Sequence, residues 1–371
     1  MKPTRRFTAV VAAIAATVAS GTLATAASAN ASPGPGRPFI APLHHTRVIA
    51  STVPQNGDVN PYGVAVVPRS TGDLHQGDVL VSNFNDKANV QGTGTTIVQV
   101  SPHGKATLFA HVADKACPGG VGLTTALVAL RSGWVIVGSL PTQNSGMLSG
   151  PGCLIALDQR GHVRATITGH GIDGPWDMTA LDRGNITELF VTNVLGGILG
   201  PHKNANGGTV QRLLITSAAN QAPRVLASTR IGSGFPAKTD PNALVIGPTG
   251  VGLGRNGTLY VADSAANRIA AIPDATFRHS SDGPGRTVSA GGALNDPLGL
   301  AIAPNGDILT VNGGNGNIVE IAPFGKQVAV RTIDTNSGGG GNLFGLAVKP
   351  HADAVYFVDD FSADNNLQLF F

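Results

Sequence analysis

The sequence predicts an all-β protein, a six-bladed β-propeller of four-stranded antiparallel blades whose last blade is closed by the N-terminal strand. Three observations support this fold class. A short apolar strand that ends in Asn, Asp or Ser recurs six times along the 371 residues. Tight-turn pairs such as Asn256-Gly257 and Asn305-Gly306 follow the first strand of the clearest units. The sixth unit lacks a fourth strand, which residues 47–52 can supply.

The repeat is aligned on the residue that closes the second strand of each unit. These residues are Asn83, Ser139, Asn193, Asp263, Asn312 and Asp359. Neighbouring units are separated by between 47 residues (312 to 359) and 70 residues (193 to 263). This spacing is typical of a propeller blade, which needs four short strands and their turns.

The other strands of each unit are apolar runs bounded by turn residues. We expect first strands at 61–68, 123–130, 175–181, 248–254, 297–304 and 343–350. We expect third strands at 95–101, 153–158, 209–215, 268–273, 317–323 and 367–371. Fourth strands are expected at 106–112, 164–170, 224–229, 286–291 and 327–333.

The N-terminal strand is expected to complete the last blade. Residues 47–52, RVIAST, nearly repeat the fourth strand at 224–229, RVLAST. Pairing with 367–371 would close the ring and remove exposed strand edges. A seventh blade is the alternative, because the interval between the third and fourth units is long. Residues 230–246 leave room for at most one strand, so six blades are favoured.

The first 29 residues have the features of a secretory signal peptide. A cationic head with Lys2, Arg5 and Arg6 precedes an Ala-rich apolar run and the small-residue site Ala27-Ser28-Ala29. The apolar run is too short to span a bilayer, so we expect no membrane span after cleavage. We predict an extracellular protein, and the Ala- and Gly-rich, Lys-poor composition indicates a bacterial source.

The expected domains are a signal peptide at 1–29, an N-terminal extension at 30–45 and the propeller at 46–371. The whole chain has a net charge of +3, and residues 1–29 carry three cations and no acid. The remainder therefore has 22 basic residues (25 less 3) against 22 acidic ones. A net charge of zero gives no electrostatic reason to expect nucleic acid or an anionic membrane as partner. We expect a monomer.

The repeat units resemble the NHL-repeat family of β-propellers. The similarity is clearest over 248–274 and 297–326, which both open with a Pro-x-Gly strand, whereas Thr124-Thr125-Ala126 and Asp177 replace that opening in units two and three. The resemblance implies a propeller over nearly the whole mature chain. It does not imply one activity, because this scaffold hosts unrelated functions.

The two cysteines, Cys117 and Cys153, are candidates for a disulfide in an exported chain. Both are expected at the same rim of blade two, two strand spacings of about 4.8 Å apart. That exceeds the usual Cα separation in a disulfide, about 4.4–6.8 Å, so slack in Gly150-Pro151-Gly152 is needed. Two free thiols are the alternative.

A candidate site follows from the blade topology. First and third strands run in the same direction, so the residues that close the second strands and the loops that lead into the first strands meet at one rim of the channel. The predicted ligand-binding residues there are Asn60, Asn83, Trp176, Asn193, Asn312 and Asn342. Asp263, Asp296 and Asp359 are candidate ligands of a divalent cation, Ca²⁺ or Mg²⁺, which takes oxygen donors. The alternative is that Asx residues at strand ends stabilise turns.

Blade three has the candidate catalytic residues. His170 and His202 lie in its rim loops, and Asp177 and Trp176 lie close by in the sequence. Imidazoles beside carboxylates suit acid–base or metal chemistry. Streptogramin lyase, a propeller that this chain distantly resembles, uses a rim His with a bound metal, although its catalytic segment is not reproduced here. Solvent-exposed loop histidines are the alternative.

Two functions of different class are consistent with these residues. The first is an exported binding module that takes a small polar ligand, a glycan or an extracellular protein at the channel rim. The second is a metal-assisted lactonase or lyase at the same rim, by similarity to gluconolactonases, senescence-marker-type lactonases and streptogramin lyase. No Glu near the start of the chain matches the lactonase metal ligand. Binding is favoured, because the sequence has no sharp catalytic motif.

Overall fold

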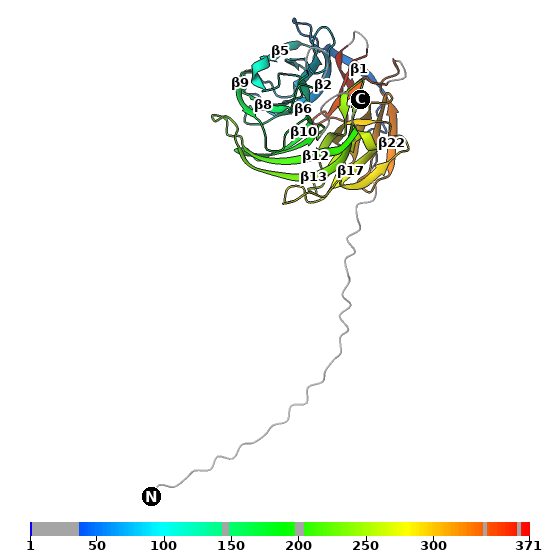
Figure 1. The fold of residues 1–371 in the computed structure, drawn as a ribbon. Helices are drawn as coiled ribbons and strands as arrows, with labels where there is room; N and C mark the ends of the chain where they lie inside the picture. The colour runs from blue at the N-terminus through cyan, green and yellow to red at the C-terminus, as the bar shows by residue number, and fades with distance from the viewer. Residues whose placement is uncertain (2–36, 143–147, 197–203, 337–339, 362–364) are drawn as a thin grey trace. The chain divides into compact units, whose positions relative to one another are not determined.

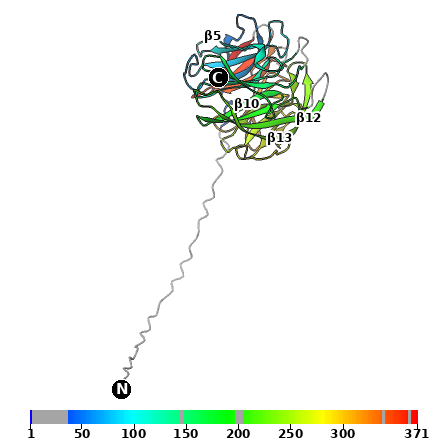
Figure 2. The ribbon, with the colours of Figure 1, turned by 60° about the vertical axis from the view of Figure 1, so that its left-hand side comes forward.

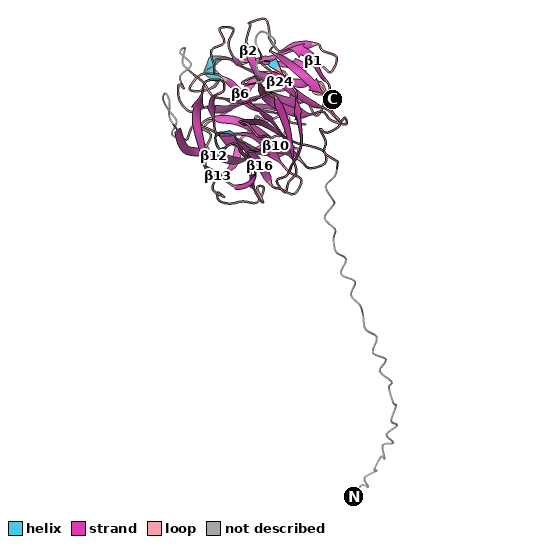
Figure 3. Cartoon of the chain, turned by 90° about the vertical axis from the view of Figure 1, so that its right-hand side faces the viewer, coloured by secondary structure: helices cyan, strands magenta, loops and turns pink. Residues whose placement is uncertain are grey.

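The computed structural model describes residue 1 and residues 37–142, 148–196, 204–336, 340–361 and 365–371. Within these ranges the chain forms β-strands and two short 3-10 helices, η1 (Asp114–Ala116) and η2 (Ser264–Ala266) (Figure 3). No helix of the described ranges has the length and hydrophobicity needed to cross a membrane. The predicted signal peptide falls almost entirely in residues 2–36, outside the described residues.

The strands form six antiparallel sheets, which are the six predicted blades. Blades one to three consist of β2 (Val59–Val66), β3 (Val79–Asn85), β4 (Thr96–Val100) and β5 (Ala106–His111); β6 (Leu123–Ala129), β7 (Val135–Ser139), β8 (Cys153–Leu157) and β9 (Val163–Ile167); and β10 (Pro175–Asp182), β11 (Ile186–Asn193), β12 (Asn204–Thr216), β13 (Val225–Asp240) and β14 (Leu244–Ile246). Blades four to six consist of β15 (Pro248–Leu253), β16 (Leu259–Asp263), β17 (Arg268–Ile272) and β18 (Arg286–Ala290); β19 (Pro297–Ile302), β20 (Ile308–Asn312), β21 (Asn317–Ile321) and β22 (Gln327–Thr332); and β23 (Leu343–Val348), β24 (Val355–Asp359), β25 (Asn366–Phe370) and β1 (Thr46–Ser51).

The first strand of each blade lies on the inner wall of the ring. The strands β2, β6, β10, β15, β19 and β23 contact one another in that order, and β23 returns to contact β2 (Figure 1). All six line one central cavity. The predicted all-β, six-bladed propeller is therefore confirmed.

The N-terminal strand closes the last blade, as predicted. Strand β1 pairs antiparallel with β25, from Thr46 opposite Phe370 to Ser51 opposite Asn366. The segment just before it also packs on the ring, because the buried Glu320 carboxylate accepts the backbone N–H groups of Phe39 (2.6 Å) and Ile40 (2.8 Å). A buried carboxylate with two backbone donors holds this segment in place.

Blade three departs from the other blades. Strand β12 has 13 residues and β13 has 16, whereas β16 and β17 of blade four have five each. Figure 2 shows the long strands β12 and β13 of this blade. Strand β14 pairs with the end of β13 as a fifth strand. The stretch 230–246 therefore extends blade three and does not form a seventh blade.

Apolar side chains fill the spaces between neighbouring blades. Leu80 and Ile97 of blade one, for example, pack in one cluster with Leu127, Val135 and Ile155 of blade two. The second strands β3, β7 and β16 are buried at every position. Burial of this apolar surface, worth about 25 cal/mol per Å², stabilises the packing of the blades on one another. Polar residues are left to the loops at the two channel mouths.

Candidate functional site

An apolar plug closes the centre of one channel mouth. We call this mouth, at which the first strands begin, the near mouth, and the opposite one the far mouth. Tyr62, Trp176 and Phe344, near the starts of β2, β10 and β23, share one buried cluster with Val245 and Ile246 of β14. The Tyr62 ring stacks on that of Phe344 with 4.0 Å between centroids, and Trp176 Nε1 donates to the Val245 carbonyl at 3.0 Å. The extension of blade three thus lies across the near mouth. Trp176, a predicted ligand-binding residue, packs against this extension and is hydrogen-bonded to it.

A polar groove of about 670 Å³ lies beside this plug. Its lining is dominated by amide side chains from blade one, the blade-three extension and blade six. We call it the amide groove, and its polar side chains are Asn60, Asn85, Asn89, Gln91, Asn242, Asn342 and Asp360. Gln91 Nε2 donates to the Pro241 carbonyl at 2.9 Å, which ties the blade-one wall to the blade-three extension.

A second, smaller pocket of about 200 Å³ adjoins the amide groove. The two share Asn242, Gly340 and Gly341, and the smaller one is lined by the carboxylates of Asp240 and Asp296. We call it the acidic pocket. Asp240 Oδ1 accepts the backbone N–H groups of Asn242 (2.9 Å) and Ala243 (3.0 Å), which shapes the turn between β13 and β14.

Two buried amides in the groove have unpaired acceptors. Asn60 and Asn85 are only 3% and 2% exposed. The Oδ1 atom of each has no hydrogen-bond partner among the described residues. The orientation of Asn85 is set by its Nδ2, which donates to Asn89 Oδ1 at 2.7 Å. Asn60 has a positive φ of 59°, and its backbone N–H donates to Asn365 Oδ1 at 2.6 Å.

Two carboxyl groups at this mouth, those of Asp360 and Asp296, resist ionisation. Burial, with the neighbouring carboxylates of Asp359 and Asp334, raises the pKa of Asp360 to about 8. Burial also raises the pKa of Asp296, Asp240 adds to this effect, and Lys238 opposes it. A low dielectric and like charges both disfavour a carboxylate, so these groups would gain from a nearby positive charge.

The predicted amides at the ends of second strands are buried and bonded to loop backbone. Asn83 Nδ2 donates to the Thr52 carbonyl at 3.0 Å, and Asn312 Nδ2 donates to the Ala293 carbonyl at 2.8 Å. Asn193 Oδ1 accepts the Asp173 N–H at 3.1 Å. These contacts stabilise turns, which was the alternative interpretation of the repeat.

The predicted metal ligands are similarly placed. Asp263 Oδ2 pairs with Arg268 Nε at 2.8 Å, and burial raises the pKa of Asp263 to about 6 while Arg268 lowers it. Asp359 accepts the Phe361 N–H and the Gln368 side-chain amide, both at 3.0 Å. Asp296 lines the acidic pocket. No group of three His, Cys, Asp or Glu side chains in the described ranges is arranged to hold a metal ion.

The predicted catalytic residues lie in different surroundings. Asp177 is buried in the channel wall, lines the central cavity of about 520 Å³ and accepts the N–H groups of Met178 (2.7 Å) and Val251 (3.1 Å). Burial raises its pKa to about 8, against the effect of these two donors. His170 is exposed on a turn with a φ of 52°. His202 lies outside the described residues.

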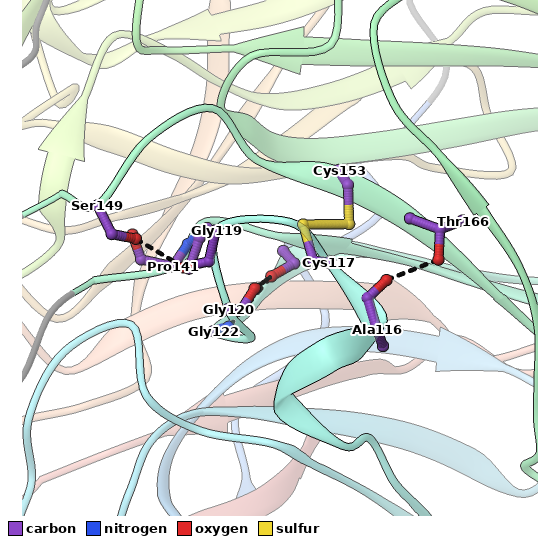
Figure 4. Close-up of a disulfide and its surroundings, with 10 residues drawn as sticks. Ala116, Cys117, Gly119, Gly120, Gly122, Pro141, Ser149, Cys153 and Thr166 are labelled. Carbon is purple, nitrogen blue, oxygen red and sulfur yellow. Dashed lines mark hydrogen bonds between the residues drawn. A yellow bond between two sulfur atoms is a disulfide. The ribbon is translucent and has the colours of Figure 1, made fainter.

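Cys117 and Cys153 form the predicted disulfide (Figure 4). Their Cα atoms are 6.0 Å apart, within the usual range. Both cysteines are buried, and the loop beside them is held by Ser149 Oγ, which donates to the Gly119 carbonyl at 2.8 Å. The bridge anchors the loop that leads into blade two.

The structure brings together three of the predicted rim residues, Asn60 and Asn342 in the amide groove and Asp296 in the acidic pocket. Sequence reasoning missed their neighbours Asn85, Asn89, Gln91, Asp240, Asn242 and Asp360. A weak signal for them exists. The loop after Asn83 is rich in amides, and Asp360 directly follows a residue of the repeat register.

Comparisons with known proteins place the fold. No family model matches the chain. No curated protein matches it. Among solved structures, a gluconolactonase from Xanthomonas campestris is similar at 12% identity and a TM-score of 0.56, over 91% of this chain and 97% of that chain. A PQQ-bound aldose sugar dehydrogenase from Streptomyces coelicolor is similar at 13% identity and a TM-score of 0.53, over 88% and 97%.

A virginiamycin B lyase from Staphylococcus aureus is similar at 15% identity and a TM-score of 0.50, over 88% of each chain. The distant similarity to lactonase and streptogramin lyase propellers that the sequence suggests is thus confirmed. Identities this low establish a shared fold and leave the activity of this chain to its own residues.

Proposed function

We propose that this protein is an exported propeller that binds a small polyhydroxylated ligand, such as one or two sugar units of a glycan, in the amide groove. The observation that carries the proposal is the lining of the groove, in which six Asn and Gln side chains surround a space of about 670 Å³. Amides both donate and accept hydrogen bonds, as hydroxyl groups do, so they can pair with several hydroxyls at once. The unpaired Oδ1 atoms of Asn60 and Asn85 are ready acceptors for such donors.

The position of the groove also supports a ligand of this size. It lies at the mouth of the ring beside a rigid aromatic plug, and concave sites of about 300–1,000 Å³ are typical of small-molecule binding. The lactonase or lyase alternative requires an ion at the same mouth. Asp263 and Asp359 are already bonded to neighbouring side chains or backbone, so we favour binding.

Export rests on residues 1–29 and is part of the proposal. The N-terminal sequence of the protein recovered from a culture medium would begin after Ala29. Recovery of the uncleaved chain from the cytoplasm alone would contradict it.

The binding proposal is tested with Asn242→Ala, which removes the exposed amide shared by the groove and the acidic pocket. Titration calorimetry with a panel of neutral monosaccharides, disaccharides and polyols should give saturable binding to the wild type. The variant should bind about fivefold more weakly, since one hydrogen bond contributes about 1 kcal/mol. Asn220→Ala, at an exposed turn of blade three, is the matched control and should bind normally.

Two results would contradict the proposal. One is the absence of saturable binding by every member of the panel. The other is equal weakening by Asn242→Ala and Asn220→Ala, which would place binding elsewhere or make it nonspecific.

A further inference from the structure

The charged side chains that line the two pockets of the near mouth are all acidic. Asp360 lines the amide groove, and Asp240 and Asp296 line the acidic pocket. Neither lining includes a Lys, Arg or His among the described residues. The carboxylates of Asp359 and Asp334 add negative charge near Asp360, and Lys238 is the one cation among the described groups that lowers the pKa of Asp296. The field inside the two pockets is therefore negative whenever these carboxyls ionise.

The same surface also has two buried acceptors that no described donor reaches. Asn60 Oδ1 and Asn85 Oδ1 are buried without a partner among the described residues, and both residues line the amide groove with Asp360. The Nδ2 of Asn85 is engaged with Asn89, and the Nδ2 of Asn342 donates to Asp334 Oδ2 at 2.6 Å. An unpaired buried acceptor is costly, and a ligand that brings donors would remove that cost.

We infer that the preferred ligand of this site carries a protonated primary amine together with hydroxyl groups, that is, a polyhydroxylated ammonium compound of the amino-sugar or amino-polyol class. An ammonium group supplies three donors, which the unpaired acceptors Asn60 Oδ1 and Asn85 Oδ1 can accept, and one positive charge, which the carboxyls of the lining attract. The other amide side chains of the groove form hydrogen bonds with the hydroxyl groups of the ligand. The inference rests on the proposed function, because it names the ligand class of the same groove.

A bare divalent cation fits the site less well. No described cluster offers three side chains of the metal-binding types, and the groove and acidic pocket together are far larger than one ion. Two adjoining pockets that meet at Asn242 instead suit an extended organic molecule, with its charged end held by Asp360 or Asp296.

Binding of an ammonium group should be linked to proton release. Burial, Asp359 and Asp334 raise the pKa of Asp360 to about 8, and burial followed by Asp360 raises the pKa of Tyr62. A bound cation favours the ionised carboxylate, so affinity should increase as the pH rises from about 6 to about 8.5. Over this range an alkyl amine keeps its proton, since its pKa is near that of Lys, about 10.4.

The experiment compares 1-amino-1-deoxysorbitol with sorbitol, which has a hydroxyl in place of the amine. Titration calorimetry of the full mature chain at pH 8 and low salt should show at least about tenfold tighter binding of the amine, as expected for a charge-assisted hydrogen bond. Titrations at pH 7 in phosphate and in HEPES, whose ionisation enthalpies differ, should show release of a fraction of a proton per amine bound. Added salt should weaken the binding of the amine and leave the binding of sorbitol unchanged.

The isosteric variants Asp360→Asn and Asp296→Asn identify the carboxylate that holds the amine. The variant that removes the carboxylate holding the amine should reduce the preference for the amine over sorbitol to about twofold or less, while sorbitol binds as before; full preference in both variants would overturn the inference. Asp296 has a φ of 50°, which Asn tolerates well, so this variant is expected to fold even if Asp360→Asn does not. Asp353→Asn, at an exposed turn of blade six, is the matched control and should keep the full preference.

The outcomes separate this inference from the proposed function. Equal binding of the amine and sorbitol, weakened alike by Asn242→Ala, would overturn the ammonium inference and keep the groove as a polyol site. Failure of both probes, and of the neutral panel, would overturn both. Stoichiometric binding of calcium chloride that Asp360→Asn or Asp296→Asn abolishes would replace the ammonium with a metal ion and also overturn the inference.

Discussion

Blade four and blade three of the same ring use their polar residues in opposite ways. Blade four has four strands of five or six residues, and its register residue Asp263 forms an ion pair with Arg268. Blade three extends β12 and β13, adds β14 and places Asp240 and Asn242 at the channel mouth. The unit that copies the repeat most closely maintains the ring, and the unit that departs from it shapes the candidate site.

The difference follows from where each blade finds its hydrogen-bond partners. In blade four the partner is a few residues away, since Asp263 Oδ2 accepts the hydrogen bond of Arg268 Nε within one strand pair. In blade three the extension reaches across the channel and is held by residues distant in the sequence. The Tyr62 hydroxyl donates to the Asn242 carbonyl, and Gln91 Nε2 donates to the Pro241 carbonyl. Polar groups between such distant segments are left facing a cavity and are available to a ligand.

The largest expected effect comes from removing the support of the blade-three extension. Trp176→Ala deletes an indole that is 2% exposed and its hydrogen bond to Val245. We expect the free energy of unfolding to fall by about 3–5 kcal/mol, as for other buried aromatic truncations, and sugar binding to be lost. Chemical denaturation and calorimetry measure the two effects. Trp176→Phe should retain most of the stability, and normal binding by Trp176→Ala would show that the extension does not shape the groove.

A smaller effect is expected from the counterpart in blade four. Asp263→Ala removes the buried partner of Arg268, whose guanidinium keeps its contacts to Thr287 and the Pro284 carbonyl. The free energy of unfolding should fall by about 2 kcal/mol, the range for a hydrogen bond to a charged group. Ligand binding should not change.

A double-mutant cycle with Arg268→Gln isolates the pair in blade four. A coupling energy near zero would show that Asp263 acts through other contacts. A loss of binding by Asp263→Ala would return Asp263 to the candidate site and weaken the contrast between the two blades.

A third effect is a pH dependence that Asp177 of blade three should carry to higher pH than Asp263 of blade four, because the pKa is raised to about 8 in the first and to about 6 in the second. The folded-state pKa of Asp177 is raised to about 8, above the value of about 3.9 in the unfolded chain. The native state therefore holds a proton that unfolding releases, so the stability from this group is full below pH 4 and is lost as the pH rises toward 8. The expected slope is at most about 1.4 kcal/mol per pH unit.

Asp177→Gly restores the residue expected from the repeat and should reduce this slope, while Asp360 and Asp263 keep their own contributions. Urea unfolding between pH 4 and pH 9 measures it, with the wild type as reference. An unchanged slope in the variant would mean that Asp177 is ionised in the native protein. Its two backbone donors, Met178 and Val251, would then outweigh its burial.

The predicted residues show how far local pattern extends. The positions of Asn60, Asn342 and Asp296 at the near mouth could be predicted, because loop position follows from strand order. The behaviour of Asn83 could not, because its Nδ2 donates to the carbonyl of Thr52, in the segment that connects blade six to blade one. Asn85 and Asp360 lie within two residues of the register positions Asn83 and Asp359 and were missed. Which of two neighbouring polar residues is satisfied by a turn depends on the loop that packs against it.

The sequence by itself determined the six blades, their strand order and the closing strand. These features depend on short apolar runs, turn residues and a repeated interval, which are local properties of the chain. Only the tertiary structure decided that residues 236–246 cross the near mouth, that Trp176 lies beneath them and that Asn60 and Asn85 keep unpaired acceptors. Those facts depend on contacts between segments as far apart as Gln91 and Pro241, which no local pattern encodes.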